Sequence, residues 1–299
     1  MSKRGWVLFG AMCILWGLPY LLIRVSVESV SPFFLVFGRT AIGAVILLPV
    51  AALRGQVVPV LTRWRPLLAF TVIEIAVPWV LLSEAETHIS SSLSGLLVAA
   101  VPLAGTVMVA LAGRSEGLRT VQLTGLVVGL GGVVAVLGFD LRTLTLGAGL
   151  EMGVVVVCYA IGPQILARRL SDLPGLGVVG CSLGLCALAY LPVALLTVPR
   201  TPPPEAALAS ILVLGVVCTA VAFILFFQLI AAIGAIRATV IAYVNPAVAV
   251  VLGVVVLHER FTLGIALGFG LILLGSLLAN RARIAGRPPD LPRPLLADS

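Results

Sequence analysis

The chain has 299 residues, of which 61% are hydrophobic and 10% are charged, and its net charge at neutral pH is +7. Soluble domains carry roughly 25% charged residues, so this composition excludes an ordinary soluble fold and favours a protein whose surface faces lipid. The positive charge does not indicate nucleic-acid binding, because the basic residues stand singly or in pairs between apolar runs, as in membrane loops. The expected partner on this evidence is the lipid bilayer, and no nucleic acid is expected.

Ten apolar stretches are long enough to cross a bilayer as helices, which takes about 20 residues each. The predicted fold class is thus an all-α integral membrane protein with ten transmembrane helices. The first stretch follows Lys3 and Arg4 as a signal peptide would, but its length and the later stretches favour an uncleaved span. In chain order the stretches are 5–23, 32–53, 66–83, 90–112, 120–138, 147–167, 175–198, 207–230, 236–257 and 262–280.

The basic residues predict the orientation of these spans. With a cytoplasmic N-terminus, 14 Lys and Arg residues fall on the inner side and four on the outer side, namely Arg24, Arg142, Arg200 and Arg260. Lys and Arg concentrate in cytoplasmic loops, so we predict a multi-pass protein of the cell membrane with both termini in the cytoplasm. Residues 282–299, rich in Pro and Arg, are predicted to be a disordered cytoplasmic tail.

An internal repeat is marked by like residues that recur at a spacing of 143 or 144. We therefore predict two five-helix repeats, residues 1–143 and 144–281. Because five is odd, the second repeat enters the membrane from the opposite side, which is the inverted symmetry of alternating-access carriers with a site near the midplane. The pairs are Pro19 and Pro163, Pro49 and Pro192, Pro102 and Pro246, Glu116 and Glu259, Gly125 and Gly268, and Gly132 and Gly275.

Signatures of enzymes and metal proteins are missing from the sequence. The five cysteines lie singly within apolar runs, which argues against a disulfide framework or a zinc site. His88 and His258 fall in predicted outer loops, and the sequence has no Walker A motif, so we expect no enzyme activity, no cofactor and no metal. A channel is disfavoured because the inverted repeat is typical of carriers.

Two stretches carry a resemblance to a known family. Residues 242–275, AYVNPAVAVVLGVVVLHERFTLGIALGFGLILLG, hold a proline, a Gly-rich run, a Glu-Arg pair and a Gly-patterned last helix. Residues 96–132 are their first-half counterpart. With Trp16 and Arg39, these features make the chain resemble the EamA branch of the drug/metabolite transporter superfamily over nearly all of residues 5–281. The resemblance implies a secondary transporter that exports small metabolites such as amino acids.

The chain also departs from the family pattern. Residues 83–90, SEAETHIS, are acidic where the family usually has a more neutral stretch, and the first-half acidic motif is shifted to Glu116. The motifs therefore indicate the fold and leave the substrate, the direction of transport and the coupling ion open.

Two charged residues are predicted deep in the membrane. Glu74 lies in the third span, where an ionisable group costs about 2.5–3.5 kcal/mol unless it is paired or hydrated. It either faces the cavity, holding a substrate amine or a coupling proton, or is a structural acid that is protonated or paired with arginine. Arg39 in the second span either forms an ion pair with Glu74 or holds a substrate carboxylate.

Aromatic and amide residues complete the candidate substrate site. Aromatic rings with a polar group suit amphipathic substrates and cations, although core packing or an interfacial belt would use the same residue types. With Arg39 and Glu74, the candidate substrate-binding residues are Trp16, Tyr20, Trp79, Tyr159, Gln228, Tyr243 and Asn245.

Four prolines within spans are candidate hinges. A proline removes one helical hydrogen bond and frees the carbonyl four residues back, which needs a partner or a wet cavity. Packing kinks are the alternative reading. The candidates are Pro78, Pro102, Pro163 and Pro246.

A second transport function remains open at this stage, namely proton-coupled multidrug efflux of hydrophobic cations. It would use Glu74 inside an aromatic cage of Trp16, Trp79 and Tyr159. Glu116 and Glu259 stand at span ends, where helix-end electrostatics is the expected role.

Glycines four apart on the fifth and tenth spans, such as Gly125 and Gly129, permit close helix contact within the bundle. Homodimerisation is an alternative use of the same glycine-rich faces.

Overall fold

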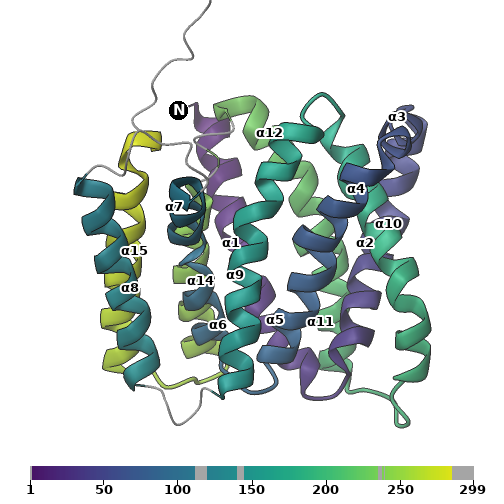
Figure 1. Ribbon diagram of the computed structural model, residues 1–299. Helices are drawn as coiled ribbons and strands as arrows, with labels where there is room; N and C mark the ends of the chain where they lie inside the picture. The colour runs from purple at the N-terminus through teal and green to yellow at the C-terminus, as the bar shows by residue number, and fades with distance from the viewer. Residues whose placement is uncertain (1, 112–119, 140–144, 235–237, 239, 285–299) are drawn as a thin grey trace, which may run out of the picture.

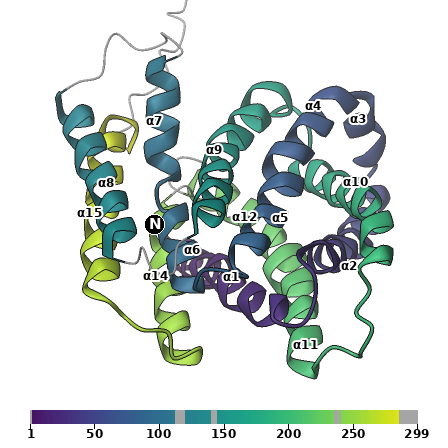
Figure 2. The same ribbon diagram turned by 60° about the horizontal axis from the view of Figure 1, so that its bottom comes forward.

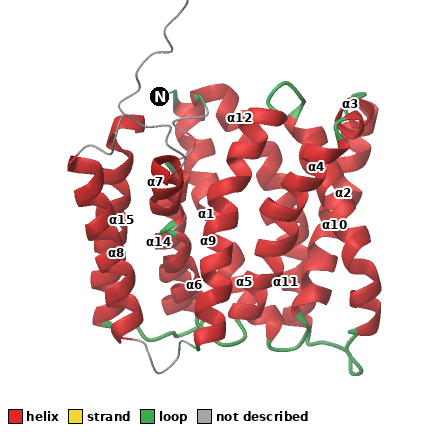
Figure 3. Ribbon diagram, viewed as in Figure 1, coloured by secondary structure: helices red, strands yellow, loops and turns green. Residues whose placement is uncertain are grey.

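The computed structural model describes residues 2–111, 120–139, 145–234, 238 and 240–284. Within these ranges the chain consists of helices and connecting loops, without a β-strand (Figure 3). Seven helical segments there are long and apolar enough to cross a membrane. They are Lys3–Val27 (α1), Pro32–Leu53 (α2), Trp64–Ala85 (α4, η1 and α5), Ser91–Met108 (α6 and most of α7), Leu146–Arg169 (α9), Gly175–Leu196 (α10) and Glu205–Ile233 (α11, η2 and α12).

Three more apolar helices occupy the remaining predicted spans in the described ranges, and two of the long segments are interrupted by π-helices. These helices are α8 (Thr120–Phe139), α14 (Ile241–Val256) and α15 (Leu263–Ile284), and the short α3 (Val57–Thr62) precedes α4. The composite segments divide into α4 (Trp64–Phe70), η1 (Thr71–Ala76) and α5 (Val77–Ala85), α6 (Ser91–Val98) and α7 (Val101–Leu111), and α11 (Glu205–Gly215), η2 (Val216–Val221) and α12 (Ala222–Ile233).

Some sequence predictions fall outside the described ranges. The predicted boundary between the repeats, after residue 143, lies among residues 140–144, and Glu116 lies among residues 112–119. Helix α15 continues to Ile284, past the predicted start of the tail, and residues 285–299 lie outside the described part of the chain.

Short polar side chains define where several spans begin. Ser31 accepts a hydrogen bond from the Phe34 amide at 3.2 Å, and Pro32 takes the first helical position, where no N–H is needed. Ser90 caps α6 in the same way through the Leu93 amide, also at 3.2 Å. Each cap satisfies one amide that no helical carbonyl can reach.

The helices form a bundle with two tightly associated pairs at its opposite edges. Helix α8 packs along α15 at one edge, and α2 packs along α10 at the other; these are the most extensive helix contacts in the described part of the chain. Figures 1 and 2 show the two pairs on the left and right, with α1, α6, α9 and α14 between them. The outside of the bundle is apolar, as lipid contact requires. Its exposed side chains include Val45, Val127, Leu188, Leu196 and Val255.

Glycines bring α8 and α15 together. A Cβ atom on Gly125 would lie 2.7 Å from the Gly275 carbonyl oxygen, and one on Gly132 would lie 2.9 Å from the Gly268 carbonyl oxygen. Side chains at these positions would force the helices apart. The prediction that glycines on the fifth and tenth spans permit close packing is confirmed, and these faces are used within the chain.

Candidate functional site

Arg39 is buried in the middle of α2 and reaches groups from two other segments. Its side chain is 7% exposed. The Nε atom donates a hydrogen bond to Thr219 Oγ1 on η2 at 2.9 Å, and the guanidinium carbon lies 3.6 Å from the centroid of the Trp79 ring on α5. A desolvated cation over an indole face is stabilised by about 2 kcal/mol. The two Nη nitrogens have no hydrogen-bond partner among the described residues, so they are free to bind a ligand.

The structural ion pair between Arg39 and Glu74 is not formed, so that prediction is wrong. Within the described ranges, the ion pairs are Arg24 with Glu28, at 3.6 Å, and Arg63 with Asp172, at 2.6 Å, and both are partly exposed. Arg39 is held instead by the Trp79 ring and Thr219, neither of which neutralises its charge.

Glu74 lies on η1 and directs its carboxyl group toward α9. Its Oε2 atom is buried and has no hydrogen-bond partner in the described structure. A Cβ atom on Gly162 would collide with this oxygen, so only glycine at position 162 leaves room for the carboxyl group. Tyr159, one turn earlier on α9, lies within electrostatic range of both Glu74 and Arg39 and within hydrogen-bonding reach of Trp79.

Tyr20 joins this group from α1. It is buried, it lies within electrostatic range of Arg39 and Tyr159, and its ring would be 3.7 Å from a Cβ atom on Gly95 of α6. Five predicted substrate-binding residues therefore come together from α1, α2, η1, α5 and α9. We refer to Tyr20, Arg39, Glu74, Trp79 and Tyr159 as the central cluster.

Two of the other predicted residues lie outside the central cluster on α1 and α12. Trp16 packs against Phe223 and Phe226, with ring centroids 5.7 and 4.6 Å away. Gln228 is exposed near the end of α12 and accepts a hydrogen bond from Arg4 at 3.3 Å. Both residues tie α1 to α12.

Tyr243 and Asn245 lie on α14 and connect it to its neighbours. The Tyr243 hydroxyl donates to the Ser276 carbonyl on α15 at 3.5 Å. With its amide oriented to suit the surrounding acceptors, Asn245 donates to the carbonyls of Cys13, at 3.2 Å, and Ile241, at 3.1 Å. Proline at position 246 is expected to free the Ala242 carbonyl. The Ile241 carbonyl that Asn245 reaches is one residue before it.

Irregular backbone accompanies two of the four predicted hinge prolines. Pro78 is the second residue after η1, where the Ala76 carbonyl accepts a hydrogen bond from the Tyr190 hydroxyl at 3.0 Å. Pro102 follows the break between α6 and α7, where the Ala99 carbonyl accepts from Ser276 at 3.3 Å.

The other two prolines are accommodated without a break. Pro163 and Pro246 lie inside continuous α-helices, α9 and α14.

The second π-helix and Thr219 were missed by sequence reasoning. Residues 216–221 contain no proline, yet η2 begins 145 residues after η1, close to the spacing of the repeat. The repeat spacing is the sequence feature from which η2 could have been predicted once η1 was known. Helix η2 positions Thr219 so that its hydroxyl oxygen accepts the hydrogen bond from Arg39 Nε.

Glu259 seals the start of α6. Its two carboxylate oxygens accept hydrogen bonds from the Ser91 amide, at 2.8 Å, and the Ser92 amide, at 3.0 Å, and from both serine hydroxyls. A carboxylate at a helix N-terminus satisfies unpaired amides and complements the helix dipole. The predicted helix-end role of Glu259 is confirmed.

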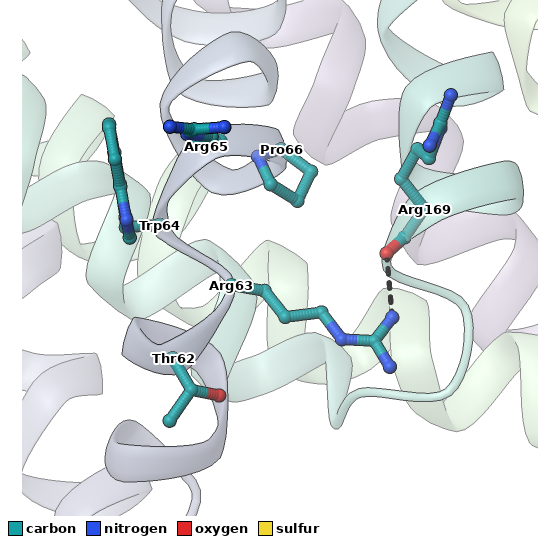
Figure 4. A pocket seen from close by; sticks show the side chains of 6 residues that line it. All are labelled: Thr62, Arg63, Trp64, Arg65, Pro66 and Arg169. Atoms are coloured by element: carbon teal, nitrogen blue, oxygen red, sulfur yellow. Dashed lines mark hydrogen bonds between the residues drawn. The ribbon is translucent and has the colours of Figure 1, made fainter.

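A cavity of about 270 Å3 lies away from the central cluster, at the start of α4 (Figure 4). Arg63 donates to the Arg169 carbonyl at 3.2 Å, and the Arg65 guanidinium lies 5.3 Å from the Trp64 ring. This cavity is a basic surface site at one end of the bundle. Its lining residues are Thr62, Arg63, Trp64, Arg65, Pro66 and Arg169.

The model of the EamA-like transporter family matches residues 3–138 and 150–281. The chain belongs to the EamA-like transporter family. The predicted resemblance is thereby confirmed, and the apolar helices and the transporter relatives together identify a multi-pass membrane protein.

Relatives in bacteria and archaea cover nearly the whole chain. The uncharacterized inner membrane transporter YedA of Escherichia coli K12 is 28% identical over 98% of this chain and 96% of its own length. An uncharacterized transporter of Archaeoglobus fulgidus is 24% identical over 94% and 100%, respectively. One crystal structure, with 21% sequence identity, superposes with a TM-score of 0.66 over 94% of this chain and 98% of that one, which shows the same fold.

Proposed function

We propose that this EamA-family protein is a secondary transporter that exports small metabolites such as amino acids across the cytoplasmic membrane by alternating access. It would have ten transmembrane helices in two inverted repeats, residues 1–143 and 144–281. The observation that carries the proposal is the central cluster, in which a buried cation and a buried acid stand on separate helices without neutralising each other. A hydrogen bond from Arg39 to Thr219 joins the two proposed repeats at this point.

The glycine contacts between α8 and α15 support the inverted symmetry. At the repeat spacing of 143, Gly125 corresponds to Gly268 and Gly132 corresponds to Gly275. The close approach of Gly125 to Gly275 therefore maps onto the approach of Gly132 to Gly268, and both occur. A two-fold axis between α8 and α15 would generate this pair of contacts.

The distribution of arginine supports cytoplasmic termini. The start of α1, the short helix α3 and the connection from α9 to α10 lie at the same end of the bundle (top in Figure 1). That end carries the basic cavity around Arg63, Arg65 and Arg169. Under the preference of Lys and Arg for the cytoplasmic side, it would be the inner end.

The charges of the central cluster match a zwitterion. The free Nη nitrogens of Arg39 suit a carboxylate, which a guanidinium binds through two parallel hydrogen bonds. The unpartnered oxygen of Glu74 suits an ammonium group or a proton. An α-amino acid carries both groups, and its binding would offset the cost of two buried charges that lack counter-ions.

The efflux of hydrophobic cations is less well supported. The proposed aromatic cage would need open faces on Trp16, Trp79 and Tyr159, but Trp16 packs on Phe226 and the Trp79 face is covered by Arg39. The arginine would also repel a cationic substrate from that ring.

Transport in proteoliposomes tests the proposal. A mixed panel of labelled amino acids and organic cations is applied with and without an imposed pH gradient. We expect amino-acid movement that Arg39→Gln and Glu74→Gln abolish and that Glu205→Gln, a change of an exposed acid on α11, leaves intact. Movement of organic cations alone would contradict the proposal.

A further inference from the structure

A second buried acid lies at the end of the bundle opposite the basic cavity. Glu86 directly follows α5, within the acidic segment 83–90, and its side chain is 0% exposed. Neither of its carboxyl oxygens has a hydrogen-bond partner among the described residues. A buried carboxylate without donors costs several kcal/mol, so such a group either takes up a proton or binds a cation.

The groups that face Glu86 come from α1, α6 and the loop after α14. Ser94 on α6 lies beside the carboxyl group, and its hydroxyl is also buried without a partner. The Nη1 atom of Arg24 on α1 donates to the main-chain carbonyl of Glu86 at 2.8 Å. Its Nη2 atom forms an ion pair with Glu28 at 3.6 Å. Glu259 is the nearest second acid, and its oxygens are occupied by the start of α6.

Burial and one neighbouring acid favour the neutral form of Glu86. Burial raises the pKa of Glu86 well above its ordinary value, and the nearby Glu259 carboxylate raises this pKa further. Ser94 and Arg24 act in the opposite direction, since each lowers the pKa of Glu86, but the hydrogen bond of Arg24 goes to the main chain. The Ser94 hydroxyl can accept a hydrogen bond from a protonated carboxyl group. The site therefore suits a proton, because a proton does not need the several oxygen ligands that a metal cation requires.

Tyr20 places this acid next to the central cluster. Its hydroxyl lies within electrostatic range of Glu86 and also of Arg39 and Tyr159. Its ring packs beside Gly95, the residue after Ser94. A change of charge at Glu86 is therefore felt at the central cluster through a single intervening side chain.

We propose that Glu86 is a proton-binding site at the outer end of the transporter, which holds a proton while it is buried as in this structure and exchanges it with the outer solution during the transport cycle. The inference rests on the proposed function for its direction and for the link to transport. It adds a second acid, distinct from Glu74, to the groups that couple transport to protons.

Infrared spectroscopy of the purified full-length chain tests the protonation directly. We expect the absorption of protonated carboxyl groups at neutral pH to lose intensity in Glu86→Gln and to be retained in Glu84→Gln, a change of a less buried acid two residues away. Equal intensity in wild type and Glu86→Gln would overturn the proposal. Repeating the infrared measurement with choline in place of sodium distinguishes a proton site from a sodium site. A protonated-carboxyl absorption that depends on sodium would also overturn the proposal.

Transport separates this proposal from the function on which it rests. For a labelled amino acid that the wild type carries, Glu86→Gln should lose stimulation by a pH gradient and retain exchange of labelled for unlabelled substrate. Retained stimulation would overturn the role of Glu86 and leave the proposed function intact. A wild type that carries no amino acid would contradict the proposed function, while the infrared titration still decides whether Glu86 holds a proton.

Discussion

The guanidinium group of Arg39 lies over the face of Trp79, 3.6 Å from the ring centroid, and donates to Thr219 across the bundle. The contact orients the cation and leaves its outer nitrogens free. It also covers the aromatic face that a cationic substrate would need. Under the proposed function, the pair would favour binding of anionic groups at the centre of this transporter.

Replacing Arg39 by lysine should weaken transport even though the charge is kept. Lysine lacks the planar group that stacks on Trp79 and bonds Thr219 at once. The loss of a desolvated cation–π contact of about 2 kcal/mol corresponds to a rise in KM of roughly 30-fold. Uptake kinetics of a carried amino acid measure this rise, and Arg200→Lys in an exposed loop is the control. An unchanged KM would exclude Arg39 from the binding site.

Gly162→Ala should destabilise the protein and disable transport, because the new methyl group would collide with the Glu74 carboxyl group. Overpacking of this kind costs about 1–3 kcal/mol. Gly153→Ala on the same helix is the matched control, since a Cβ atom there meets nothing within 4 Å. Thermal unfolding of the purified protein in detergent measures both. Equal melting temperatures for the two variants would show that Glu74 does not press against α9.

Gly132→Ala should separate α8 from α15, whereas Gly131→Ala should not. A Cβ atom on Gly132 would lie 2.7 Å from the Ile272 backbone nitrogen, while one on Gly131 meets open space. Melting temperature and cross-linking between cysteines introduced on the two helices measure the effect. A Gly132→Ala protein that cross-links and melts like Gly131→Ala would argue against the close helix contact.

Glu86 should make the protein less stable as the pH rises. Its pKa in the folded protein is raised above the ordinary value of 4.5, so the folded state holds the proton more tightly than the unfolded state does. The associated stability is present in full below pH 4.5 and is lost as the pH rises through the raised pKa. Glu86→Gln should therefore melt at a higher temperature than wild type at alkaline pH.

The matched control for this change is Glu84→Gln, which should keep the pH dependence of the wild type. Melting curves across the pH range measure the difference between the two variants. If Glu86→Gln and wild type lose stability in parallel as the pH rises, Glu86 is not the group that titrates.

Much of the fold could be predicted from the sequence because the hydrophobic effect and the bilayer act on long segments. A stretch of about 20 apolar residues has few alternatives to a membrane helix, and glycines at helical spacing mark close packing. The roles of Gly125 and Glu259 followed from their places within such segments.

The central cluster was predicted only in part, because its residues depend on contacts between segments. Arg39 and Glu74 stood out since charges are rare within spans, but their partners depend on two π-helices that shift the helical register. The prediction for Trp16 depends on its residue type, and the one for Asn245 on its place before Pro246. An aromatic ring or an amide within a span serves packing as well as binding. Composition alone does not separate these roles.

The carboxylate that seals the start of α6 belongs to a residue 168 positions later in the chain. During synthesis, the fourth span would enter the membrane long before Glu259 is made. Until then the amides of Ser91 and Ser92 must be satisfied by water or lipid head groups. This end of the first half is therefore completed late in biogenesis, by the loop between α14 and α15.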